Sequence, residues 1–139
     1  MSPATWRRFF RPRLQLVWDV YRQAGLPVIY HSCGNVIALI PDMIEMGLDM
    51  LEPIQPVMDL KFLKREFGRH LSFWGGIDTQ RILPYGTPDE VRRHTTEVID
   101  TLGAGGGLLI APSQEIMPDV PVENIVAMVE TVVRQRSHM

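Results

Sequence analysis

A histidine and a cysteine lie two residues apart in the stretch YHSCGNV, residues 30–36, which holds the only cysteine of the sequence. His31 and Cys33 follow the apolar run Leu26–Ile29, so both lie at the end of a predicted strand. On extended backbone, side chains at i and i+2 leave the same side. Such a pair could bind one zinc ion or form a histidine-activated cysteine. It is also compatible with a small buried thiol beside a hydrogen-bonded histidine.

Polar residues follow each of the four predicted strands, and in parallel α/β folds sites form at the carboxyl ends of strands. The pattern therefore predicts one shared site at that face of the sheet. A His-x-Cys pair alone is a weak metal signal, because zinc needs three or four protein ligands. The strand-end residues are His31 and Cys33, Glu52 and Gln55, Asp78 and Gln80, and finally Ser113, Gln114 and Glu115.

The elements that position these residues alternate between helix and strand, which predicts a parallel sheet covered by helices. A first helix begins at Ser2-Pro3, with Pro12 as a kink or a join, and ends at Gly25. The short strands are almost entirely apolar, as buried parallel strands are. Strands are predicted at 28–31, 49–53, 71–74 (closed by Gly75-Gly76) and 108–111, and further helices at 36–46, 60–67, 87–102 and 121–133.

Composition excludes several classes of function. The 139 residues are 45% hydrophobic and 22% charged, with a net charge of −2, so nothing indicates nucleic acid or an anionic membrane surface. Four arginines at 7, 8, 11 and 13 alternate with apolar residues, which is typical of the solvent-exposed face of an amphipathic helix. The single cysteine excludes an internal disulfide, and no apolar run approaches the roughly 20 residues that span a bilayer. We therefore expect a cytoplasmic protein, with residues 136–139 as a cloning scar.

Four segments, PVIYHSCGNV, MGLDMLEPIQP, LSFWGGIDTQRILPYGTPDEV and GGLLIAPSQEIMPDVPVENIVAMVE, together resemble the carboxyl-terminal half of the uroporphyrinogen decarboxylase family. The likeness is strongest to the branch of corrinoid-dependent, methylcobamide:coenzyme M-type methyltransferases. It implies that residues 1–135 form the carboxyl-terminal half of a (β/α)8 TIM barrel, with four parallel strands.

In the methyltransferase branch, the resemblance implies a zinc ion held by the His-x-Cys pair and by a further cysteine after the last strand. His31 and Cys33 match the pair, whereas Gln114 stands where the further cysteine is expected. Zinc activates a small-molecule thiol there, and a partner protein carries the corrinoid methyl donor. Glu52 or Glu115 could supply an oxygen ligand in this chain, and Glu52, Gln55 and Gln114 are candidate substrate-binding residues.

The decarboxylase branch is the alternative, with a tetrapyrrole-type substrate, no metal and lyase activity. That branch carries a histidine at the position of Gln114 and draws its catalytic aspartate and its substrate arginines from the amino-terminal half. Asp78 lies where family members have a related strand-end acid, so it is the candidate catalytic residue. It could equally cap its own following turn.

A complete barrel needs about 250 residues and eight strands, so four strands leave two open sheet edges. We expect the chain to form a homodimer or to pair with a complementing amino-terminal half. A monomer that covers its sheet edge with the first helix is the alternative. Three hypotheses follow: a zinc-dependent methyltransferase half that is inactive alone, a metal-free decarboxylase, and a non-catalytic half-barrel that self-associates.

Overall fold

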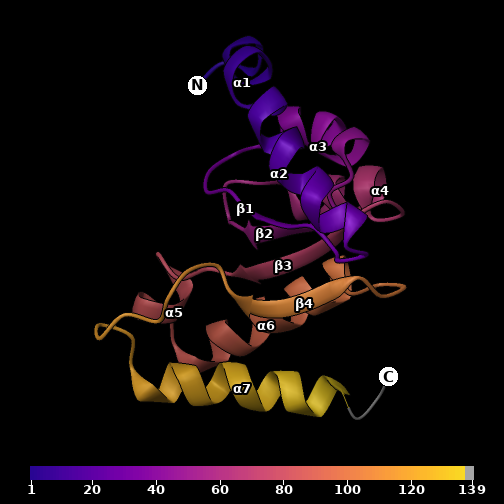
Figure 1. The fold of residues 1–139 in the computed structure, drawn as a ribbon. Coiled ribbons are helices and arrows are strands. Elements are labelled where there is room, and N and C mark those ends of the chain that lie inside the picture. The colour runs from indigo at the N-terminus through magenta and orange to yellow at the C-terminus, as the bar shows by residue number, and fades with distance from the viewer. Residues whose placement is uncertain (137–139) are drawn as a thin grey trace.

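The computed structural model describes residues 1–136, which fold into one four-stranded sheet with helices around it (Figure 1). The elements follow the chain as α1 (Pro3–Phe9), α2 (Arg11–Gln23), β1 (Ile29–His31), the 3-10 helix η1 (Ile37–Leu39), α3 (Ile40–Met46), β2 (Met50–Ile54), α4 (Leu60–Phe67), β3 (Ser72–Ile77), α5 (Ile82–Tyr85), α6 (Pro88–Leu102), β4 (Leu108–Pro112) and α7 (Val122–Arg136). Of the predicted cloning scar at 136–139, Arg136 ends α7 and the other residues lie outside the described part.

The sheet is parallel throughout, and its strands lie side by side in chain order, β1-β2-β3-β4. Each strand is followed by a helix before the next strand begins, which confirms the predicted α/β class with four parallel strands. Figure 1 shows the strands in this order, with α1 and α7 at opposite ends of the molecule. Residues of β2 and β3 such as Leu51, Ile54 and Phe73 are fully buried and form the centre of the core.

Pro12 marks a join between two helices, one of the two predicted outcomes. α1 ends at Phe9 and α2 begins at Arg11, so proline occupies the first turn of α2, where its missing N–H removes no helical hydrogen bond. Trp18 of α2 packs edge-on against Tyr30 of β1, with ring centroids 5.3 Å apart. This contact packs α2 against the edge strand β1.

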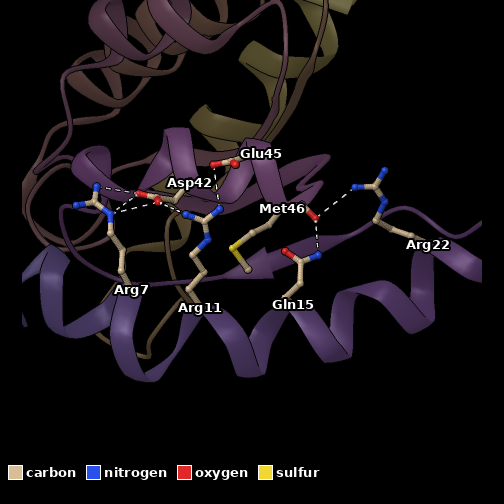
Figure 2. Close-up of polar contacts among 7 residues, drawn as sticks. All are labelled: Arg7, Arg11, Gln15, Arg22, Asp42, Glu45 and Met46. Carbon is tan, nitrogen blue, oxygen red and sulfur yellow. Dashed lines mark hydrogen bonds and ion pairs between the residues drawn. The ribbon is translucent and has the colours of Figure 1, made fainter.

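Polar side chains join these first helices to α3, and Figure 2 shows them pointing across the gap. The Asp42 carboxylate accepts hydrogen bonds from Arg7 Nε at 2.9 Å and from Arg11 Nη1 at 2.7 Å. Arg11 also pairs with Glu45, at 2.9 Å. Arg7 holds the pKa of Asp42 below its usual value through these bonds, although burial opposes the shift. We predicted that the four arginines lie on the solvent-exposed face of a helix. In the structure, Arg7 and Arg11 instead form ion pairs that hold α1 and α2 against α3.

Further contacts continue this seam along α2. Gln15 and Arg22 both donate to the backbone oxygen of Met46, at 3.3 Å each, and so satisfy a carbonyl at the end of α3 (Figure 2).

The helix predicted at 36–46 is divided in two, a 3-10 turn followed by α3. Pro41 lies in the first turn of α3 and has no N–H to donate to the preceding turn, so a continuous α-helix through it would lose a hydrogen bond. The predicted end at Gly47 is confirmed, because that residue adopts φ +97° as the left-handed cap.

The prediction that Gly75-Gly76 closes the third strand was wrong. Both residues lie inside β3 and pair with Ile110 and Ala111 of β4. They adopt φ of +114° and +100°, which side-chain-bearing residues rarely do. A Cβ on Gly76 would lie 2.6 Å from Cγ1 of Val98 in α6. Glycine here lets the strand continue while α6 packs directly against its backbone.

The helix that begins after Thr87 agrees with its prediction. Thr87 and Glu90 form a reciprocal capping box, and these bonds to Thr87 lower the pKa of Glu90. α6 packs against β3, β4, α4 and α7, so it is the central helix on its side of the sheet. The short helix α5 was not predicted; it contributes buried Leu83 and Pro84 to the core.

Both edges of the sheet are open within the described residues, since β1 pairs with β2 alone and β4 with β3 alone. Apolar side chains remain exposed there, including Ile29 at 49% and Leu109 at 46%. On α7, Val126 and Val129 are also exposed, and Val129 lines a cavity of about 190 Å³ between that helix and β4. Across residues 1–136, no helix combines the length and apolar character needed to cross a bilayer.

Candidate functional site

His31 and Glu52 lie directly opposite each other on the paired strands β1 and β2. Their side chains leave the same face of the sheet, and Glu52 Oε2 lies 2.5 Å from His31 Nδ1. Tyr30, the residue before, packs toward Trp18 on α2, as strand alternation requires. The carboxylate therefore fixes the imidazole with its other nitrogen, Nε2, pointing away from Glu52.

Cys33 lies in the turn after β1, with its sulfur 3.3 Å from His31 Nε2. The side-chain oxygen of Gln55 accepts a hydrogen bond from the backbone N–H of Gly34 at 2.6 Å, which holds this turn against the end of β2. Gly34 adopts φ +87°, a value that suits glycine. Gln55, predicted to bind substrate, thus uses its oxygen to position the loop that carries the thiol.

Gln114 completes the arrangement from the far edge of the sheet, because its Nε2 donates to the Cys33 sulfur at 3.0 Å. We call the four side chains Glu52, His31, Cys33 and Gln114 the thiol network. They come from the ends of β1, β2 and β4, and the structure brings Cys33 into contact with Gln114, which lies 81 positions later in the sequence. The predicted convergence of strand ends is seen for these four residues.

The thiol network is open to solvent. The His31 side chain is 58% exposed and that of Glu52 is 24% exposed, while Cys33 and Gln114 are exposed residues. A small molecule could therefore reach the sulfur without any movement of the chain. This accessibility differs from the small buried thiol that the sequence also allowed.

Asp78, the predicted catalytic residue, has no hydrogen bond to the thiol network. It is only 6% exposed, and its Oδ1 accepts the backbone N–H groups of Gln80 at 2.7 Å and Arg81 at 3.0 Å. These contacts are those of an acid that caps its own turn, the alternative that the sequence left open.

Two polar contacts around Asp78 involve residues that sequence reasoning placed elsewhere or passed over. His94 of α6 accepts the backbone N–H of Asp78 through Nε2 at 3.1 Å. Buried Ser113 contacts the Thr79 hydroxyl at 3.2 Å, which links the ends of β3 and β4. His94 lies within an amphipathic helix, and no local spacing could have connected it with a strand end 16 residues earlier.

A zinc ion at the thiol network would have two protein donors. From zinc–nitrogen and zinc–sulfur bond lengths, an imidazole nitrogen and a thiolate on one tetrahedral ion lie about 3.5 Å apart, close to the 3.3 Å between His31 Nε2 and Cys33 Sγ. Glu52, however, contacts the other ring nitrogen, and Gln114 turns an N–H donor toward the sulfur. No group of three potential His, Cys, Asp or Glu ligands occurs among residues 1–136. The described residues therefore do not form a three-ligand zinc site.

A parallel sheet with helices between its strands and polar residues gathered at the strand ends defines the chain as an α/β protein with a strand-end site. The family model for uroporphyrinogen decarboxylase (URO-D) matches residues 1–135, and the chain belongs to that family.

Proteins with two different named activities, a methyltransferase and a decarboxylase, are similar in sequence to this chain. The chain is 30% identical over 129 residues to the methylcobamide:CoM methyltransferase MtaA of Methanosarcina barkeri, covering 93% of this chain and 36% of that protein. It is 29% identical over 133 residues to a uroporphyrinogen decarboxylase of Thermus thermophilus, covering 95% and 37%. A solved methyltransferase from Methanosarcina mazei superimposes with a TM-score of 0.77 at 26% identity, over 98% of this chain and 38% of the other. The chain thus spans little more than a third of these relatives.

Proposed function

We propose that the chain supplies the thiol-handling part of an enzyme that transfers a methyl group from a methylated corrinoid to a small-molecule thiol. The observation that carries this proposal is the thiol network, in which an exposed sulfur lies between the His31 imidazole and the Gln114 amide. The similarity to a protein named as a methylcobamide:CoM methyltransferase supports it. The corrinoid would come from a partner protein.

Activity would require strands beyond the four described. Both sheet edges are open and carry exposed apolar side chains, Ile29 on one and Leu109 on the other. A sheet of this kind is stabilised when its edges are paired or covered. We therefore expect the chain alone to be inactive, and a complementing half or a second copy to cover the edges.

A complementation assay tests this function. The chain is co-expressed with the part of the M. barkeri methyltransferase that it does not match, and methyl transfer from methylcobalamin to coenzyme M is followed by the absorbance of the corrinoid. We expect transfer in the mixture, none with either part alone, and none when the chain carries Cys33→Ser. Stable co-purification of the two parts without any methyl transfer would contradict the proposal.

Decarboxylation of a porphyrinogen is the second candidate, because the chain is almost as similar to a uroporphyrinogen decarboxylase. The same co-expression with the remainder of the Thermus enzyme, assayed for uroporphyrinogen consumption, separates the two. Consumption that survives Cys33→Ser and is lost with Asp78→Asn would favour the decarboxylase. Association without either activity would favour a non-catalytic role.

A further inference from the structure

A single arginine stands among the segments that follow the four strands. These segments, at 32–36, 55–59, 78–87 and 113–121, contain Arg81 and no other lysine or arginine. The residue is exposed, and its guanidinium forms no hydrogen bond or ion pair with any residue between 1 and 136. A guanidinium presents several N–H donors in one plane, which match the oxygens of a carboxylate, sulfonate or phosphate. Arg81 therefore offers an unused anion-binding group at the end of the sheet that carries the thiol network.

The backbone that carries Arg81 is held firmly. Asp78 is only 6% exposed, and its Oδ1 accepts the N–H groups of Gln80 at 2.7 Å and of Arg81 at 3.0 Å. The N–H of Asp78 itself donates to Nε2 of His94 on α6 at 3.1 Å. The turn after β3 is thus fixed from within by a buried carboxylate and from outside by a helix, while the side chain of Arg81 stays open to solvent.

This turn adjoins the thiol network. The Thr79 hydroxyl lies 3.2 Å from that of Ser113, and Ser113 is followed by Gln114, whose amide contacts the thiol. β3 also lies between β2 and β4, the strands whose ends supply Glu52 and Gln114. Arg81 therefore follows the strand that the thiol network crosses, and a small molecule at the thiol has a cation at its side.

The carboxylates at this end of the sheet leave Arg81 unpaired. Glu52 contacts the imidazole of the thiol network, and Asp78 is turned to backbone N–H groups. Glu115 and Asp119, in the loop after β4, are exposed and make no ion pair with a described residue. The positive charge of Arg81 is consequently available to a ligand from outside the chain.

We propose that Arg81 binds the anionic group of the thiol substrate, so that the site selects small thiols that carry a sulfonate or a carboxylate. The inference rests on the proposed function and deepens it, because it names the substrate class and a residue that recognises it. Asp78 is a positioning residue here: it fixes the backbone of the turn and does not touch the substrate.

Titration of the purified chain, followed by amide chemical shifts in NMR spectra, tests this inference. The probes are 2-mercaptoethanesulfonate, ethanesulfonate, which lacks the thiol, and 2-mercaptoethanol, which lacks the charge. We expect both sulfonates to shift the amides of residues 79–81. 2-Mercaptoethanol should bind about tenfold more weakly than 2-mercaptoethanesulfonate, because it makes no charged hydrogen bond. Since Arg81 is exposed, sulfonate binding should also weaken as salt is added.

Arg81→Met should weaken binding of both sulfonates about tenfold and leave that of 2-mercaptoethanol unchanged. Arg69→Met is the matched control. Arg69 is exposed and its side chain forms no hydrogen bond or ion pair with a described residue, but it precedes β3 whereas Arg81 follows it, so this variant should bind as the parent chain does.

Asp78 is tested by a pair of variants. Asp78→Ala removes the acceptor of the turn and should weaken sulfonate binding several-fold. Asp78→Asn keeps a side-chain oxygen that can accept the same two N–H groups, so it should restore most of the affinity. Circular dichroism checks that each variant is folded.

Equal affinity of the parent chain for 2-mercaptoethanesulfonate and 2-mercaptoethanol overturns the proposal, as does equal sulfonate binding by the parent chain and Arg81→Met. Absence of saturable sulfonate binding to the parent chain overturns it as well. These titrations need no corrinoid and no methyl transfer, so the anion site can fail while the complementation assay succeeds, and the reverse. In the complemented enzyme, Arg81→Met should raise the KM for coenzyme M with little change in kcat.

Discussion

The side-chain amide of Gln114 contacts the sulfur of Cys33 at 3.0 Å, although β2 and β3 lie between the strands that carry them. In a flat sheet, three strand spacings would separate β1 from β4 by about 14 Å. The contact therefore requires the strand ends to curve toward each other and the side chains to extend across the concave face. The wall of a barrel has such curvature. It allows the ends of β1 and β4 to contribute side chains to one site.

Replacing Gln114 by cysteine should raise the number of possible zinc ligands at the site from two to three. The new thiolate would lie beside Cys33, where zinc could bind it together with His31. We expect elemental analysis under reductant to find little zinc in the parent chain and close to one equivalent in Gln114→Cys. The double variant Cys33→Ser/Gln114→Cys should lose it. Equal zinc in the parent chain and in Gln114→Cys would show that residue 114 does not control metal binding.

Gly76→Ala should destabilise the fold by about 2–4 kcal/mol, because it combines an unfavourable φ with a collision against Val98. Gly105 provides the control. It has φ +73° but nothing within 4 Å of the position of a Cβ, so Gly105→Ala should cost only about 1–2 kcal/mol. Urea unfolding measures both free energies. Equal losses would mean that packing against α6 contributes nothing.

Asp42→Asn should lower the free energy of unfolding by about 1–3 kcal/mol at pH 7, since Arg7 and Arg11 lose a charged acceptor. The pKa of Asp42 is lowered in the folded chain, chiefly by Arg7. A lowered folded pKa gives stability that is present above the unfolded value of 3.8 and lost as pH falls through the folded value. The difference between parent and variant should therefore shrink below about pH 4.

Urea unfolding at pH 7 and at pH 3 provides this measurement. Asp119→Asn serves as the control, because Asp119 is exposed and makes no ion pair with any described residue. A difference between parent and Asp42→Asn that stays constant between the two pH values would show that the arginines do not discriminate the charged carboxylate.

The purified chain should self-associate through its open edges, and light scattering should report a mass above that of a monomer. Leu109→Lys places a charge on the exposed edge strand β4 and should shift the chain toward monomer. Val57→Lys is the comparison, since that residue is also exposed, at 58%, but lies between β2 and α4. A parent chain that is monomeric at high concentration would count against the edges as association surfaces.

The strands and helices could be predicted closely because their signals are local. Asp59 and Thr87 cap the helices that begin where expected, and short apolar runs mark the strands. The errors came where tertiary contacts decide. Gly75 and Gly76 read as a turn, yet pairing with β4 on one side and close packing of α6 on the other keep them in a strand. The local sequence around these glycines does not reveal that β4 and α6 are their neighbours.

Part of the site could also be predicted, because local spacing and strand order determine which side chains share a face. The i, i+2 spacing places His31 and Cys33 on one side, and topology places Glu52 and Gln114 at the same face. That Glu52 would bind the imidazole, or that Gln114 would reach across two strands to the sulfur, depends on strand register and curvature. Asp78 shows the limit, because a strand-end acid in a sequence looks the same whether it faces a substrate or its own backbone.

The agreement between strand order and chain order has a consequence for how this protein is made. Each strand pairs with the one synthesised just before it, so a growing chain can add strands one at a time to a sheet that already exists. Cys33, however, leaves the ribosome 81 residues ahead of Gln114. Its sulfur gains its amide neighbour only after β4 has been added. The hydrogen bond from Gln114 to this thiol can therefore form only after the last strand of the sheet has been added.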